Sequence, residues 1–143
     1  MAAKDEDTTK LSAQERAALR ERTRELKAAK KGAEAEQAVL DAIAALSDAE
    51  RPLAERVHAL IKEAAPELAA RTWYGMPAYA NKDGKVICFF KAASKFDVRY
   101  AELGFNEPAN LDDGNMWPTA FALVELTSAE EERITELVKR AAS

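Results

Sequence analysis

The sequence predicts a two-layer α+β domain, in which helices cover an antiparallel sheet, together with a helical extension at the N-terminus. Apolar residues recur at helical spacing near both ends of the chain, whereas between residues 71 and 126 their period shortens towards two. Turn signals separate the short apolar stretches, which favours antiparallel pairing. A chain of 143 residues has the usual size of one domain and can bury a core without disulfides or metals.

Residues 1–31 make up the predicted extension and residues 32–143 the predicted domain. Ser12 and Glu15 have the spacing of a capping box, and no Gly or Pro follows before Gly32, so we expect a helix over residues 13–31. At 100° per residue, five basic side chains fall within an arc of roughly 80°. This basic stripe consists of Arg16, Arg20, Arg24, Lys27 and Lys31.

The two parts of the chain carry opposite net charge. Residues 1–31 hold nine Lys or Arg and six Asp or Glu, whereas residues 32–143 hold twelve and nineteen. Because like charges four residues apart destabilise a helix, the basic stripe predicts an anionic surface opposite it. We expect the acidic helices of the same domain or of a partner subunit. The acidic domain argues against nucleic acid, which stays the second candidate, and simple solvation is the plain alternative.

Helices are expected from Val39 to Leu46, from a capping box at Ser47 to the residue before Pro66, and over residues 127–141. Strands are expected at residues 73–79, 86–90, 96–100 and 119–126, with a tight turn at 81–84. Residues 106–118 form a loop that should fold back onto the domain, because it contains Leu111, Met116 and Trp117.

Two of the expected strands, residues 86–90 and 119–126, are apolar on both faces. The helices of a two-layer domain cover only one face of a sheet. We therefore expect the second face to be covered by a homodimer partner, by the N-terminal helix or by a ligand.

Three segments carry a family resemblance: TWYGMPAY at residues 72–79, KVICFFKAASKFDVRYAELGF at 85–105 and NLDDGNMWPTAFALVEL at 110–126. They resemble the bacterial YdhG-like family of domains of unknown function, over roughly residues 33–142. The resemblance implies a small antiparallel sheet flanked by helices, similar in outline to frataxin. Some relatives are described as frataxin-like intracellular iron chaperones, so iron is the candidate cofactor, although no residue transfers from the family as a ligand.

Acidic residues in and near the predicted 106–118 loop are the candidate metal ligands, because carboxylate oxygens can hold a hard cation such as iron. They are Glu102, Glu107, Asp112 and Asp113. Their spacing is not that of an EF-hand, and solvated loop charge is the alternative interpretation.

The aromatic residues are concentrated between residues 73 and 121, where they could line a small-molecule or protein-binding site. Ordinary core packing is the alternative for each of them. The candidate pocket consists of Trp73, Tyr74, Met76, Tyr79, Phe90, Tyr100 and Trp117.

No catalytic signature is present in the sequence. His58, the only histidine, has no metal or acid–base partners at recognisable spacing, and Cys88 lies in an apolar strand where burial makes a thiol a poor nucleophile. We therefore expect a binding protein rather than an enzyme. A single cysteine, no apolar run of membrane-spanning length and no hydrophobic leader in residues 1–10 together predict a cytoplasmic protein.

Overall fold

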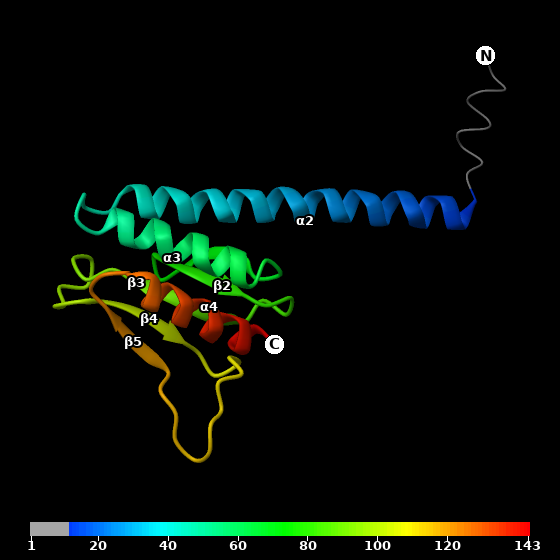
Figure 1. The fold of residues 1–143 in the computed structure, drawn as a ribbon. Coiled ribbons are helices and arrows are strands. Elements are labelled where there is room, and N and C mark those ends of the chain that lie inside the picture. The colour runs from blue at the N-terminus through cyan, green and yellow to red at the C-terminus, as the bar shows by residue number, and fades with distance from the viewer. Residues whose placement is uncertain (1–11) are drawn as a thin grey trace. The chain divides into compact units, whose positions relative to one another are not determined.

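The computed structural model describes residues 12–143, which form an α+β fold (Figure 1). Its helices are α2 (Ala13–Ala44), α3 (Arg51–Ala64) and α4 (Ser128–Ala142). Its strands are β1 (Ala69–Trp73), β2 (Met76–Ala80), β3 (Val86–Lys91), β4 (Ala101–Phe105) and β5 (Ala120–Leu123). The predicted class, an antiparallel sheet covered by helices, is confirmed. The prediction about a leader in residues 1–10 lies outside the described residues.

The sheet is a meander in which each strand pairs antiparallel with the next, in the order β1-β2-β3-β4-β5. One face contributes Tyr79, Phe90 and Leu103 to a single core cluster, which also contains Val57 of α3 and Val138 of α4. Figure 1 shows α3 and α4 side by side over this face. The core therefore lies between the sheet and these helices.

Helix α2 continues through Gly32, so the expected break between two helices at this residue is wrong. Glycine costs about 1 kcal/mol relative to alanine inside a helix, which is too little to interrupt strong helix formers on both sides. The Ser12 hydroxyl accepts a hydrogen bond from the backbone N–H of Glu15 at 3.0 Å, so the predicted cap is present. The chain nevertheless divides into two compact units, the first ending at Ala33 and the second spanning Glu34–Ser143.

Two expected strands differ from the structure. Residues 73–79 do not form one strand, because the chain reverses at Tyr74 and Gly75 and pairs Trp73 with Met76. Residues 96–100 are not a strand either; Asp97 has a φ of 52°, and β4 begins only at Ala101. The alternation of apolar and polar residues in 96–100 therefore did not mark a buried face.

The beginning of α3 and the burial of residues in the 106–118 loop also differ in part from the predictions. Helix α3 begins at Arg51, and Ser47 does not cap it through its side chain. Instead, the Glu50 carboxylate accepts hydrogen bonds from the N–H and hydroxyl of Ser94, both at 2.8 Å. In the loop, Leu111 is buried as expected, whereas Met116 is 89% exposed.

No helix between residues 12 and 143 combines the length and the apolar content needed to cross a bilayer.

Candidate functional site

The predicted aromatic pocket is divided between the two faces of the sheet. Tyr79 and Phe90 are buried in the core cluster beneath the helices, so they are core residues and not pocket residues. Trp73 and Met76 lie on the opposite face, and Met76 is buried without belonging to the core cluster. The single predicted pocket is therefore wrong, and the second face of the sheet is the part that remains as a candidate site.

This second face, called the open face below, is defined by the strand register. Arg71 pairs with Ala78, Ala78 with Phe89, Phe89 with Gly104, and Gly104 with Ala120. On each strand, a residue two positions away from these lies on the same face. The open face includes Arg71, Trp73, Met76, Ala78, Phe89, Lys91, Glu102, Gly104, Ala120 and Ala122.

Three rings form a continuous aromatic row, which we define as Tyr74, Trp73 and Phe89. The ring centroids of Trp73 and Tyr74 lie 4.9 Å apart and those of Trp73 and Phe89 lie 5.2 Å apart. Phe89 lies directly over Gly104, so closely that a Cβ atom at Gly104 would collide with the ring. Gly104 therefore allows the row to rest on β4. Phe89 was not among the predicted site residues, because residues 86–90 are all apolar and do not indicate which side chains face outward.

The end of the row is the tip of the β1–β2 hairpin. Tyr74 and Gly75 have φ values of 51° and 75°, as a two-residue type I′ turn requires. Glycine adopts this conformation freely, whereas a tyrosine does so at a cost of about 1–3 kcal/mol. The Tyr74 ring is 79% exposed, so burial of the ring does not offset that cost.

Cationic side chains lie at the same end of the sheet as the row. Lys95 donates a hydrogen bond to the backbone carbonyl of Gly75 at 2.7 Å, which ties the β3–β4 loop to the hairpin tip. The Lys91 Nζ lies 5.3 Å from the centre of the Phe96 ring, and the Arg99 guanidinium lies 5.1 Å from that of Tyr100. Residues 91–100, at the end of the sheet that carries the row, contain three Lys or Arg and one Asp or Glu, although the second unit as a whole is acidic. This end of the sheet is therefore a local basic region.

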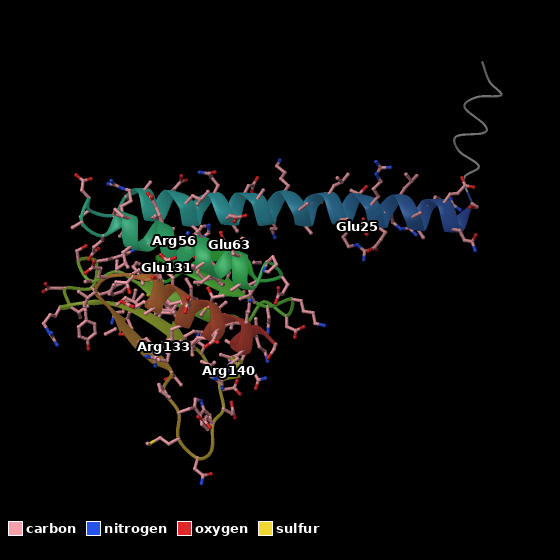
Figure 2. All side chains as sticks on the ribbon, viewed as in Figure 1. Glu25, Arg56, Glu63, Glu131, Arg133 and Arg140 are labelled. Carbon is pink, nitrogen blue, oxygen red and sulfur yellow. The ribbon has the colours of Figure 1, made fainter. Side chains whose placement is uncertain are left out.

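The remaining predicted pocket residues lie elsewhere. Tyr100 is 38% exposed and precedes β4. Trp117 is half-buried between two hollows of about 230 and 450 Å³, which also share Leu111. Arg133 and Arg140 of α4 line the smaller hollow (Figure 2). Because the lining of this hollow also includes Asp113 and Glu136, its charges balance.

The four predicted metal ligands are not gathered into one group. Glu102 lies on β4, Glu107 and Asp112 line the larger hollow beside Trp117, and Asp113 lines the smaller one. Among residues 12–143, no three His, Cys, Asp or Glu side chains lie close enough to hold a metal ion. The spacing in the sequence therefore did not predict a shared position in space.

His58 and Cys88 both occupy structural positions. His58 Nδ1 lies 2.8 Å from the hydroxyl of buried Tyr79, which donates to it in the neutral tautomer that carries its proton on Nε2. Burial lowers the pKa of His58 below its ordinary 6.5 and so favours that neutral form. Cys88 is fully buried, and burial raises the pKa of its thiol to about 12, which makes it a poor nucleophile at neutral pH.

The basic stripe lies in the first unit, where every residue from 12 to 33 is exposed. Leu19 and Leu26, at 53% and 63% exposure, border the stripe on one side. Within residues 12–33 the only ion pair joins Arg24 and Glu21, at 3.5 Å. The remaining cations of the stripe, Arg16, Arg20, Lys27 and Lys31, thus have no carboxylate within 4 Å in the described part of the chain.

No protein family, no curated protein and no solved structure matches this chain. The YdhG-like resemblance and the iron function it implies therefore stay predictions from the three sequence segments.

Proposed function

We propose that the protein is a non-enzymatic binding module that docks an acidic protein segment on the aromatic row and the adjoining part of the open face. The observation that carries this proposal is Tyr74, a bulky residue in a left-handed turn position with most of its ring in solvent. An asparagine at this position would form the same turn at lower cost. Strained residues that are exposed concentrate at sites of recognition.

The composition of the row fits protein recognition. Tyrosine and tryptophan contribute large contact areas at low entropic cost and are enriched among residues that dominate interfaces. The stacking of Tyr74 on Trp73 and of Trp73 on Phe89 orders these rings before a partner arrives. Such order lowers the entropy lost on binding.

The charges around the row favour an acidic partner. Lys91, Lys95 and Arg99 lie at the same end of the sheet as the row, so carboxylates of a bound segment could pair with them. A nucleic acid is a less suitable partner, because Glu102 pairs with Lys91 in the sheet register and the rest of the unit is acidic. A short acidic segment would feel mainly the local cations. The free thiol of Cys88 suits a reducing compartment such as the cytoplasm.

Random peptides displayed on phage provide a test that requires no known partner. We expect the wild-type protein to select peptides that combine Asp or Glu with apolar residues, and Tyr74→Asn to lose these peptides by at least about tenfold in affinity. The same substitution should leave the thermal midpoint unchanged or raise it, because it relieves the strained turn. A gain in stability together with a loss of binding would separate a recognition role from a structural one.

The matched control is Met116→Asn, which removes a similarly exposed apolar side chain from the 106–118 loop. We expect it to bind the selected peptides as the wild type does. Equal losses in the two variants would contradict the proposal, as would selected peptides without acidic residues. Binding of a single-stranded oligonucleotide that depends on Tyr74 and exceeds peptide binding would replace the proposal with nucleic-acid recognition.

A further inference from the structure

The second unit has an acidic groove on the surface of α3 and α4. The groove measures about 520 Å³, and Leu60 of α3 forms its apolar floor. Three carboxylates from α4 line it: Glu131, Glu132 and Glu136. Ser128 and Thr135 complete the lining, which contains no cation. We call this feature the glutamate groove.

Arg56 of α3, which contacts Glu131 in the groove, is already neutralised. Arg56 donates two hydrogen bonds to Glu131, at 2.6 and 3.1 Å, and Glu63 of α3 adds a further negative charge beside it (Figure 2). The positive charge of the Arg56 guanidinium is cancelled by the Glu131 carboxylate, so the pair adds no net charge to the groove. Glu132 and Glu136 form no ion pair within 4 Å in the described part of the chain. These two carboxylates are thus available to a partner.

The basic stripe has the complementary pattern. Its residues Arg16, Arg20 and Arg24 follow one another at four-residue intervals, which is also the separation of Glu132 and Glu136. Both helices rise about 1.5 Å per residue, so charges at this interval stay matched when two helices lie alongside each other. Leu19 and Leu26 border the stripe and could contact the apolar floor of the groove. Charge and apolar surface are therefore complementary in the two features.

We propose that the glutamate groove of one copy of this chain binds residues 12–31 of a second copy. The occupant is assigned to a second copy because residues 12–31 of this chain carry the opposite charge at the same four-residue interval, next to two exposed leucines. Two such contacts, exchanged between two chains, would form a symmetric dimer. The exchange would also place an anionic surface opposite cations that repel one another along the helix.

Sedimentation equilibrium of the full chain at low and high salt tests the proposal. We expect a dimer at low salt that dissociates as salt increases, because screening weakens the charge pairs. Arg20→Glu lies in the stripe and should weaken the dimer by at least about tenfold, whereas Arg22→Glu lies outside the stripe and should change it less than about twofold. The two variants make the same change of charge on the same helix.

Reversing the charges of both surfaces distinguishes direct contact between the stripe and the groove from a general effect of the net charge of the protein. Glu132→Arg/Glu136→Arg should abolish the dimer of the otherwise unchanged chain. Combining it with Arg16→Glu/Arg20→Glu/Arg24→Glu should restore the dimer, because the two surfaces are again opposite in charge. A monomer at all salt concentrations would overturn the proposal, and so would equal effects of Arg20→Glu and Arg22→Glu. Tighter binding of a double-stranded DNA oligonucleotide than of the second copy, with the same dependence on Arg20, would overturn it as well.

Discussion

The two faces of the sheet use the same kinds of residue for different purposes. Phe89 and Phe90 are neighbours in sequence, yet Phe90 is 1% exposed in the core cluster whereas Phe89 is half-buried on the open face. On the helix side, Tyr79 and Phe90 are buried in the core cluster between the sheet and the helices. On the open face, rings stack on one another at the edge of solvent. Residue type therefore does not separate the core face from the open face; the side of the strand does.

The largest expected difference between the two faces is in stability. Phe90→Ala should lower the free energy of unfolding by about 3–5 kcal/mol, because it leaves a cavity in a closed core. Phe89→Ala should lower it by about 1–2 kcal/mol, since solvent and neighbouring side chains can occupy the vacated space. Urea unfolding of both variants measures the difference. Similar losses would mean that the open face is as closed as the core.

Gly104 offers a sharper test of the open face. Gly104→Ala should destabilise the protein by about 1–3 kcal/mol, because the new methyl group displaces the Phe89 ring. In a Phe89→Ala background the same change should cost much less, since nothing remains to be displaced. A double-mutant cycle from urea unfolding gives this coupling energy. Additive effects would show that the cost of Gly104→Ala comes from elsewhere.

Gly32 is the opposite case, because a Cβ atom there would meet no other atom within 4 Å. Gly32→Ala should therefore stabilise α2 by about 1 kcal/mol through its helix propensity alone. The helical signal in circular dichroism should persist to a higher temperature. A lower thermal midpoint for Gly32→Ala would contradict this expectation.

The smallest effect is a pH dependence on the helix side. Burial holds the pKa of His58 in the folded protein below its ordinary value of 6.5. As the pH falls through about 6.5, the unfolded chain gains a proton that the folded protein does not take up, so stability decreases until the folded pKa is reached. His58→Gln should flatten this slope in urea unfolding between about pH 7 and pH 5. The slope should be unchanged in Met116→Ala, and an unchanged slope in His58→Gln would contradict the assignment to His58.

The sequence predicted the fold better than the site. Apolar periodicity and capping residues were sufficient for the α+β class and for α4, because those signals are local. The predicted strand at 96–100 was wrong, since an alternating pattern does not show that φ is positive at Asp97. The predicted break in α2 was also wrong, since the sequence does not show whether a single glycine ends a helix. The aromatic row could not be predicted, because it depends on which face of β3 carries Phe89 and on the space above Gly104.

The thiol of Cys88, the single cysteine, can report local unfolding of the protein. Cys88 has no solvent contact and a pKa of about 12, so a disulfide reagent added at neutral pH should not modify the native protein directly. Modification requires that β3 separate from the helices. The rate at which the reagent reacts with the intact chain therefore measures how often the central strand is exposed, without any engineered label. Any bound partner that stabilises the open face should slow that reaction.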